Sequence, residues 1–212
     1  MTTDIREQMA RAAADHLAAS DPIMAELVAA HGLFTPLPHT DYYWELVDSI
    51  ISQQLSVKAA RTIEQRFLAL FDGKVPAAPE LLSKTVEELR AVGLSRAKAS
   101  YVLDLAKHVA DGELQLERLP DLSNEEATKE LVAVKGIGEW TAHMFLIFAL
   151  GRLDVLPVGD LGIRTGIQKL YNLPALPSPA EVATLAKQRN WHPYESVASW
   201  YVWQALDAVP TD

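Results

Sequence analysis

The sequence has no cysteine among its 212 residues. An iron–sulfur cluster, which proteins hold through cysteine thiolates, is therefore excluded. Long apolar runs are also missing, because the most apolar stretch, residues 139–150, is too short to span a membrane. Neither a signal peptide nor a lipidation motif is apparent, so we expect a cytoplasmic protein with no membrane partner.

Metal-binding and nucleotide-binding signatures are missing too. The histidines do not form an H-E-x-x-H pair or another zinc spacing, and no G-x-x-x-x-G-K-[ST] loop occurs. Alternating apolar and polar residues bounded by turn pairs are sparse, which argues against a sheet. The sequence thus gives no support to a metal hydrolase or a nucleotidase, and it favours an all-α fold.

Positive charge is in short supply. The chain has 19 lysine and arginine residues against 28 aspartate and glutamate residues, for a net charge of −9. Such a balance opposes nonspecific affinity for nucleic acid. The local cations near the motifs are Lys58, Arg61, Arg96, Lys98 and Lys135. For each of them except Lys135, the simplest interpretation is a solvated surface charge.

Hydrophobic residues make up 49% of the chain, enough for a core in one domain or in two small lobes. Apolar spacing and capping residues predict helices over 4–19, 22–30, 42–53, 57–71, 85–92, 96–110, 161–171 and 182–190, and a last helix from Pro193. The expected helix caps are Asp41, Ser56 and Ser95, with capping boxes at Ser123/Glu126 and Ser178/Glu181.

A short glycine motif, Lys135-Gly136-Ile137-Gly138, separates two apolar helical segments. The glycines permit a tight turn, and backbone N–H groups at the start of the second helix are left without helical partners. Such amides can hold a phosphate. Glycines also end helices for purely structural reasons, so the helix-hairpin-helix pattern over about 124–150 is weak evidence alone.

A single aspartate, Asp160, follows Leu156-Pro157-Val158-Gly159 and opens the helix expected over 161–171. In the simplest interpretation it is an ordinary N-cap, which accepts backbone hydrogen bonds and benefits from the helix dipole. The same surroundings keep a carboxylate ionised. A fixed negative charge is also what an oxocarbenium-like transition state requires beside it.

Together these motifs resemble the helix-hairpin-helix (HhH-GPD) DNA glycosylases, in the branch of 3-methyladenine DNA glycosylase II. The resemblance covers about residues 40–208 and is carried by segments 45–66, 134–142 and 156–164. It implies two helical lobes with a DNA- and base-binding cleft between them, in a single glycosylase unit over 1–212. In that family the aspartate corresponding to Asp160 is catalytic.

The resemblance also assigns the contacts with double-stranded DNA. Backbone amides near Gly136, Gly138 and Thr141 would grip phosphate beside Lys135, and a segment over 93–98 would bring Ser95 and Arg96 to the DNA side. Family members often hold Na⁺ or K⁺ at the hairpin, through carbonyls corresponding to Val132, Val134 and Ile137. No cofactor is expected for catalysis.

One position indicates the subfamily. Members that also cut the strand carry a lysine nucleophile where this chain has Trp140, and an indole cannot form a Schiff base. The resemblance therefore implies a monofunctional enzyme that leaves an abasic site. Alkylated bases are cationic and suit an aromatic face. The implied base-pocket residues, which core packing would also explain, are Trp140, Trp203, Met144, Leu161, Tyr42 and Trp44.

Flipping a base out of a duplex leaves a gap that family members fill with a side chain from the turn after the helix containing Glu45. Gln54 and Leu55 both lie there, and the sequence does not decide between them. Gln54 would hydrogen-bond the orphaned partner base, whereas Leu55 would fill space. Alternatively, Leu55 simply ends a buried helix.

The chain departs from the family in places that affect base preference. Only about 40 residues precede the motif core, so we expect no N-terminal β domain. Leu161 and Met144 replace two tyrosines of the enterobacterial enzyme, Lys135 replaces the usual hairpin proline, and Glu195 replaces an arginine.

We therefore predict a monomeric glycosylase of base excision repair that removes 3-methyladenine or 7-methylguanine. Three alternatives stay open at this point: a glycosylase that prefers deaminated bases, a noncatalytic DNA-binding module, and an all-helical interaction protein.

Overall fold

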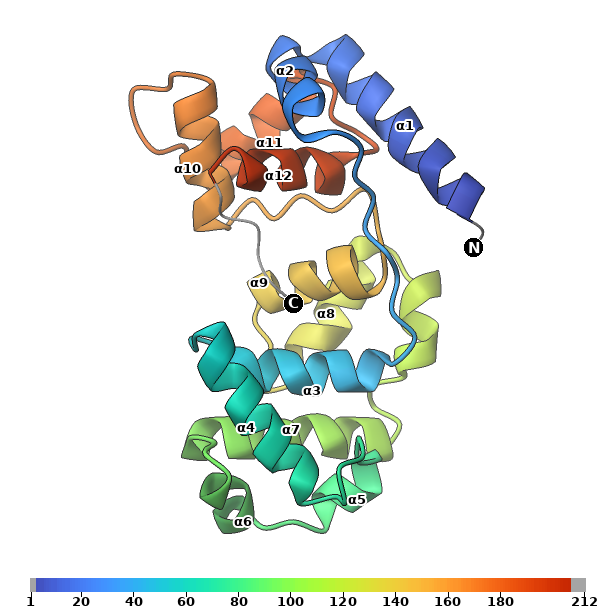
Figure 1. Ribbon diagram of the computed structural model, residues 1–212, viewed down its shortest axis with the longest axis vertical. Coiled ribbons are helices and arrows are strands. Elements are labelled where there is room, and N and C mark those ends of the chain that lie inside the picture. Colours follow the sequence, from blue (N-terminus) through green and yellow to red (C-terminus); the bar gives the residue numbers. More distant parts are fainter. Residues whose placement is uncertain (1–2, 207–212) are drawn as a thin grey trace. The chain divides into compact units, whose positions relative to one another are not determined.

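The computed structural model describes residues 3–206, with side chains from residue 5 onward. Over this range the chain forms helices and turns and no β-strand (Figure 1). It divides into two compact units, one of Met1–His39 with Leu146–Asp212 and one of Thr40–Phe145. The predicted all-α fold with two helical lobes is confirmed. Residues 207 and 208, the end of the expected core, lie outside the described residues.

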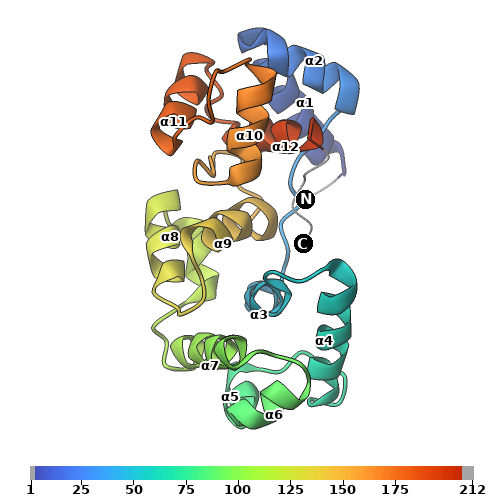
Figure 2. The same cartoon turned by 90° about the vertical axis from the view of Figure 1, so that its left-hand side faces the viewer.

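The first unit is organised around one central helix. Its helices are α1 (Thr3–Ser20), α2 (Pro22–His31), α10 (Leu161–Leu170), α11 (Pro179–Gln188) and α12 (Glu195–Gln204). Helix α12 contacts α1, α2 and α10, and Figure 2 shows it from a second side. Because seven of its residues from Ser196 to Trp203 are buried, α12 is the core of this unit.

The buried carboxylate of Asp21 forms hydrogen bonds with three segments of the first unit. Asp21 caps α2 by accepting the Ile23 amide at 3.0 Å, and the Tyr171 hydroxyl and the Trp191 indole N–H also donate to it. Burial, followed by the bond to Asp21, raises the pKa of Tyr171. The start of α2, the end of α10 and the turn after α11 are thereby joined.

The second unit is built on helix α7 (Arg96–Ala110), which contacts α3, α5 and α6. Its other elements are α3 (Tyr42–Ser52), α4 (Val57–Ala69), α5 (Ala78–Leu82), α6 (Val86–Ala91), a 3₁₀ turn (Leu116–Asp121), α8 (Asn124–Val132) and α9 (Glu139–Met144). Buried Ala99, Val102, Leu105 and Ala106 recur at helical spacing along α7.

The predicted caps are confirmed. Asp41, Ser56 and Ser95 each accept a backbone N–H at the start of the following helix, and the two predicted capping boxes form. Because a capping box encloses the first turn, α11 begins at Pro179, earlier than predicted. The last helix begins at Glu195, two residues after the expected Pro193.

Other boundaries also differ from the predictions. Helix α9 ends at Met144, and residues Phe145–Ala149 form a π-helical turn that apolar spacing does not distinguish from an α-helix. Helix α5 and the 3₁₀ turn were not predicted, because they are shorter than the pattern needed to recognise a helix. No helix in the described range is long and apolar enough to cross a membrane.

Candidate functional site

Asp160 is held at the first turn of α10. Its amide donates to the Pro157 carbonyl at 2.9 Å, and its own carbonyl accepts the Arg164 amide at 3.0 Å. The segment before it is fixed by Ser196 of α12, whose hydroxyl accepts the Val155 amide at 3.0 Å. The backbone on both sides of Asp160 is therefore anchored to α10 and α12.

Asp160 is 9% exposed, and its Oδ1 accepts two hydrogen bonds. One comes from the Ile163 amide at 2.7 Å and the other from the Trp203 indole Nε1 at 2.9 Å. Two donors on one oxygen restrict the rotation of the carboxylate. Asp160 is thus both the N-cap of α10 and a fixed carboxylate. The two interpretations of this residue in the sequence analysis, a helix cap and a fixed negative charge, are therefore compatible.

Two glycines allow α12 to approach Asp160. A Cβ added at Gly162 would lie 3.0 Å from Asp160 Oδ1 and 3.1 Å from Trp203 Cδ1. A Cβ added at Gly166, one helical turn later, would overlap Val202 Cγ1. The two positions lie on the face of α10 that packs on α12, so their lack of a side chain brings Trp203 within reach of Asp160.

In the second unit, the glycine motif forms the predicted turn between α8 and α9. Gly136 has a φ of +89°, and a Cβ there would overlap the ring of Tyr101 on α7. Glycine is therefore required both by the left-handed backbone and by the close ring. The hairpin rests directly on α7.

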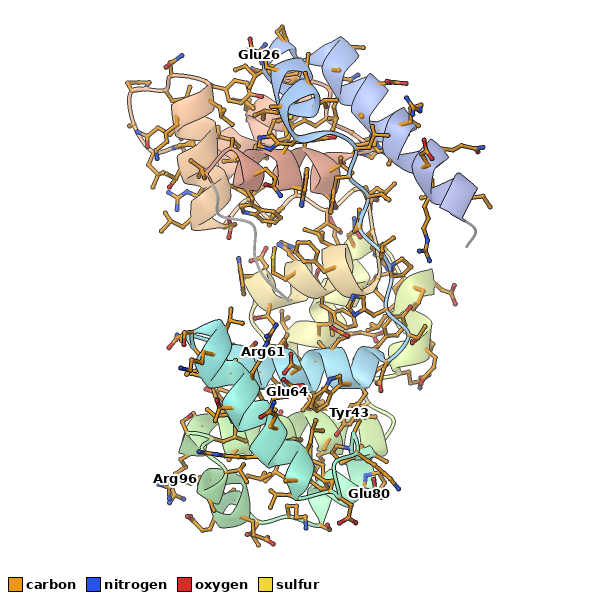
Figure 3. All side chains as sticks on the ribbon, in the orientation of Figure 1. Glu26, Tyr43, Arg61, Glu64, Glu80 and Arg96 are labelled. Carbon is orange, nitrogen blue, oxygen red and sulfur yellow. The ribbon has the colours of Figure 1, made fainter. Side chains whose placement is uncertain are left out.

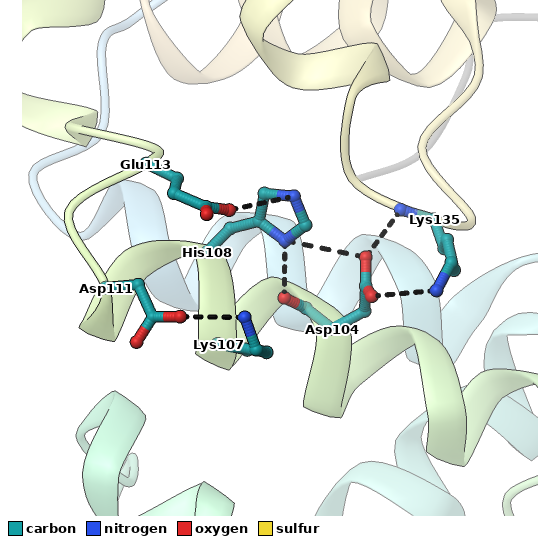
Figure 4. Close-up of polar contacts among 6 residues, drawn as sticks. All are labelled: Asp104, Lys107, His108, Asp111, Glu113 and Lys135. Atoms are coloured by element: carbon teal, nitrogen blue, oxygen red, sulfur yellow. Dashed lines mark hydrogen bonds and ion pairs between the residues drawn. The ribbon is translucent and has the colours of Figure 1, made fainter.

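Lys135 is tied to α7 by its backbone and its side chain (Figure 4). Its amide donates to Asp104 Oδ2 at 2.9 Å, and its ammonium lies 3.4 Å from Asp104 Oδ1. Burial opposes ionisation of Asp104, but the bonds and charge of Lys135 outweigh it and lower the pKa of that carboxyl. The Lys135 amide is therefore occupied, while its ammonium remains largely exposed.

The other predicted hairpin contacts stay predictions. Gly138 is the exposed N-cap residue of α9, and its carbonyl accepts the Ala142 amide at 2.9 Å. The amides of the first turn, among them that of buried Thr141, have no hydrogen-bond partner within the helix. The carbonyls predicted to bind a cation are those of Val132, Val134 and Ile137. The Val134 carbonyl accepts the Ile137 amide at 3.2 Å, and Val132 is the last residue of α8.

The predicted base-pocket residues differ in exposure. Trp140 is 48% exposed and Leu161 is 63% exposed, whereas Trp203 is fully buried. Met144 is half-buried at the end of α9. Leu161 and Trp203 lie in the first unit and the other two in the second.

The two predicted base-pocket residues at the start of α3, Tyr42 and Trp44, contact different neighbours. The ring centroids of Tyr42 and Phe145 are 5.9 Å apart, and those of Trp44 and buried Phe67 are 6.2 Å apart. Trp44 therefore packs toward α4. A role for either ring in base binding stays a prediction.

Gln54 and Leu55 both lie in the turn between α3 and α4 and are exposed. Gln54 has a φ of +57°, a backbone conformation that few residues other than glycine adopt. Helix α3 ends at Ser52, so Leu55 does not end a buried helix. Which of the two side chains would enter DNA stays undecided.

The expected local cations have different surroundings. Figure 3 labels Arg61 on α4 and Arg96, the first residue of α7. Arg61 is exposed, whereas Arg96 forms an ion pair of 2.9 Å with Glu87. Ser95 caps α7 through the Lys98 amide at 3.2 Å. The interpretation of Lys98 as a solvated surface cation is wrong, because its ammonium donates to the carbonyls of Ile51 and Gln53 at 2.7 and 2.6 Å.

The contacts made by several residues of the site were missed by sequence reasoning. Gln53, Lys98, Tyr101 and Asp104 hold the hairpin and the turn after α3, yet each has an ordinary helical context in the sequence. The spacing of Lys98, Tyr101 and Asp104, three residues apart on one helix, was a signal that they share a face.

Comparison with known proteins identifies relatives of this chain. The model of a family described as "HhH-GPD superfamily base excision DNA repair protein" matches residues 47–191. DNA-3-methyladenine glycosylase 1 of Schizosaccharomyces pombe is 35% identical over 214 residues, covering 96% of this chain and 93% of that protein.

Two solved structures are similar as well. The crystal structure of a DNA-3-methyladenine glycosidase from Bacillus halodurans has a TM-score of 0.82 and 35% identity, covering 91% of this chain and 88% of that one. The S. pombe 3-methyladenine DNA glycosylase Mag1, in complex with abasic DNA, has a TM-score of 0.79 and 34% identity, covering 94% of this chain and 99% of that one.

Proposed function

Because this chain belongs to the HhH-GPD superfamily of base excision DNA repair proteins, we propose that it is a DNA glycosylase that removes alkylated bases from double-stranded DNA. The names of its relatives point to 3-methyladenine as a substrate, and 7-methylguanine is a second cationic alkylated purine that we include in the proposal. The observation that carries the proposal is the buried Asp160 carboxylate, fixed by Ile163 and Trp203. A module that only binds DNA needs a cap for this helix but has no need of a buried negative charge.

The proposed reaction is hydrolysis of the N-glycosidic bond. The bond between C1′ and N9 of the alkylated purine breaks, and the base leaves with the electron pair. The base was cationic and departs neutral, so little acid catalysis is needed. The negative charge of Asp160 stabilises the oxocarbenium-like sugar and orients a water whose oxygen bonds to C1′. That water releases one proton, which balances the charge.

Trp140 supports the choice of substrate. Its exposed indole offers an aromatic face to a cationic base, an arrangement favoured by the ring quadrupole. Because an indole cannot form a Schiff base, we propose that the enzyme leaves the abasic strand uncut. Its catalysis requires no cofactor, and it acts as a monomer.

The hairpin is the proposed phosphate-binding element. Amides at Gly136, Gly138 and Thr141 would donate to one phosphate, with Na⁺ or K⁺ held by nearby carbonyls. Recognition by backbone amides suits a chain of net charge −9, because it requires few basic side chains.

The test measures release of methylated bases from an alkylated duplex by the wild type and by Asp160→Asn. Asparagine can still cap α10 but carries no charge. We expect the wild type to free 3-methyladenine or 7-methylguanine and the variant to free neither while still binding the duplex. Asp41→Asn, which changes another N-cap aspartate, should remain active.

The same assay separates the alternatives. Duplexes with uracil or hypoxanthine would reveal a preference for deaminated bases, and strand cutting without alkali would reveal lyase activity. If the wild type and Asp160→Asn bind DNA equally and neither frees a base, the chain is a noncatalytic binding module. Absence of DNA binding would indicate a protein-interaction role.

A further inference from the structure

One face of α7 contacts two segments that are far apart in the sequence. Lys98, Tyr101 and Asp104 succeed one another at intervals of three residues and so lie along one side of the helix. Lys98 reaches the turn after α3, while Tyr101 and Asp104 contact the hairpin. We call residues 53–56 the wedge turn, since they contain Gln54 and Leu55.

Lys98 holds the start of the wedge turn. The last carbonyls of a helix lack partners within it and carry partial negative charge. The Lys98 ammonium donates to two such carbonyls, of Ile51 at 2.7 Å and of Gln53 at 2.6 Å. Burial lowers the pKa of Lys98. The ammonium fixes the backbone just before Gln54, whose left-handed conformation directs the turn.

Gln53 joins the wedge turn directly to the hairpin. Its side-chain Nε2 donates to the Gly136 carbonyl at 3.0 Å. The neighbouring Lys135 amide is held by Asp104, and Gly136 itself rests on Tyr101. A displacement of the hairpin backbone would therefore be transmitted to Gln53, and through it to Gln54 and Leu55.

We propose that Gln53 and Lys98 are positioning residues that couple the wedge turn to the hairpin, so that binding of phosphate at the hairpin sets the wedge for insertion. Neither residue touches the reacting atoms. Their contribution is to place the wedge side chain relative to the bound backbone phosphate when a base leaves the stack. This inference rests on the proposed glycosylase function.

The first test is Gln53→Leu, which removes the amide donor at similar size. The matched control is Gln115→Leu, because Gln115 Nε2 also donates to a glycine carbonyl, that of Gly112 at 3.4 Å, away from the hairpin. We expect Gln53→Leu to lower the single-turnover excision rate about tenfold, the scale of one hydrogen bond. Its affinity for undamaged duplex and its Tm should match those of the control.

Lys98 provides a rescue test. Lys98→Met removes the ammonium and should reduce wedge insertion, which is followed by the fluorescence of 2-aminopurine beside an abasic site. Lys98→Arg keeps N–H donors for the two carbonyls and should recover most of that signal. Lys107→Met on the same helix removes an exposed ion pair with Asp111 and should change nothing. Equal signals from Lys98→Met and Lys107→Met would overturn the proposal.

A double-mutant cycle measures the coupling itself. Gln54→Ala and Leu55→Ala are first compared, and the more damaging one is introduced into the Gln53→Leu and Gln115→Leu backgrounds. We expect the loss of excision rate caused by this wedge substitution to be at least threefold smaller in the Gln53→Leu background. In the Gln115→Leu background the loss should be as large as in the wild type. Equal costs in both backgrounds refute the coupling alone. A wild type that neither binds DNA nor frees bases refutes the proposed function and the coupling with it.

Discussion

At the scale of single residues, the bond between Trp203 and Asp160 defines what the tryptophan does in the folded chain. We expect Trp203→Phe to lower the single-turnover excision rate between about tenfold and a hundredfold, because a hydrogen bond to a charged group is worth about 1.5–3 kcal/mol. A phenyl ring keeps most of the buried volume but has no N–H donor. The excision rate and the affinity for an abasic duplex are both measured for Trp203→Phe and for the wild type.

Trp191→Phe is the matched control for this change. Its indole is equally buried and donates to a carboxylate of the same unit, Asp21, at 3.1 Å. The Trp191→Phe variant should be less stable than the wild type, but its folded form should excise bases at the wild-type rate. If Trp203→Phe excises at the wild-type rate, the indole does not position Asp160.

The pKa of Asp48 gives a pH-dependent prediction. Burial, and then the charges of Glu64 and Glu45, raise this pKa from 3.8 to about 6. The folded protein thus keeps a proton that the unfolded chain releases, so stability falls as pH rises between these two values. We expect Asp48→Asn to stabilise the protein at pH 7.5 by about 1 kcal/mol, after allowance for solvent screening.

Urea unfolding at two pH values tests this. At pH 3.5 Asp48 is largely protonated in both states, so Asp48→Asn and the wild type should differ little. The exposed Asp121→Asn serves as a control whose effect should be small at both values. An equal gain from Asp48→Asn at pH 3.5 and 7.5 would show that charge is not its origin.

At the scale of helices, the crossing of α10 and α12 depends on glycine. We expect Gly166→Ala to lower the free energy of unfolding by about 1–3 kcal/mol, because the new Cβ would overlap Val202 Cγ1. Separation of the helices would also weaken the Trp203 bond and reduce excision. Denaturant unfolding and an excision assay on the folded variant measure the two effects.

Gly159→Ala is the control, since a Cβ there has no neighbour within 4 Å. Adding Val202→Ala to Gly166→Ala should recover excision by restoring space between the helices, even though the second change also removes buried volume. If Gly166→Ala is as stable and active as Gly159→Ala, close approach of α10 and α12 is not required.

Helices and caps were largely predictable because their signals are local. A helix start is indicated within a few residues by the capping box of Ser123 and Glu126 and by the N-cap Asp41. The hairpin glycines were equally visible. The contact of Gln53 with Gly136 spans 83 positions, and no local pattern reveals it. The same holds for Trp203 and Asp160, which were assigned from family resemblance to separate roles and are joined only by the packing of α10 on α12.

At the scale of the whole molecule, the number of DNA phosphates that the protein neutralises determines how DNA affinity responds to salt. If this chain of net charge −9 binds phosphate mainly through backbone amides, as proposed above, it releases few condensed counterions. We expect log K for an undamaged duplex to fall with log salt at a slope of about −2 to −3, corresponding to two or three neutralised phosphates. Fluorescence anisotropy over a salt series measures it.

The same series with an abasic duplex tests where specificity arises. If the flipped-out site adds contacts with the sugar and neighbouring bases, affinity should rise at every salt concentration while the slope stays nearly unchanged. Arg61→Gln on exposed α4 should make the slope shallower by about one unit only if that guanidinium meets a phosphate. A wild-type slope of about −6 or steeper would contradict recognition by amides, because so many released counterions require a basic surface.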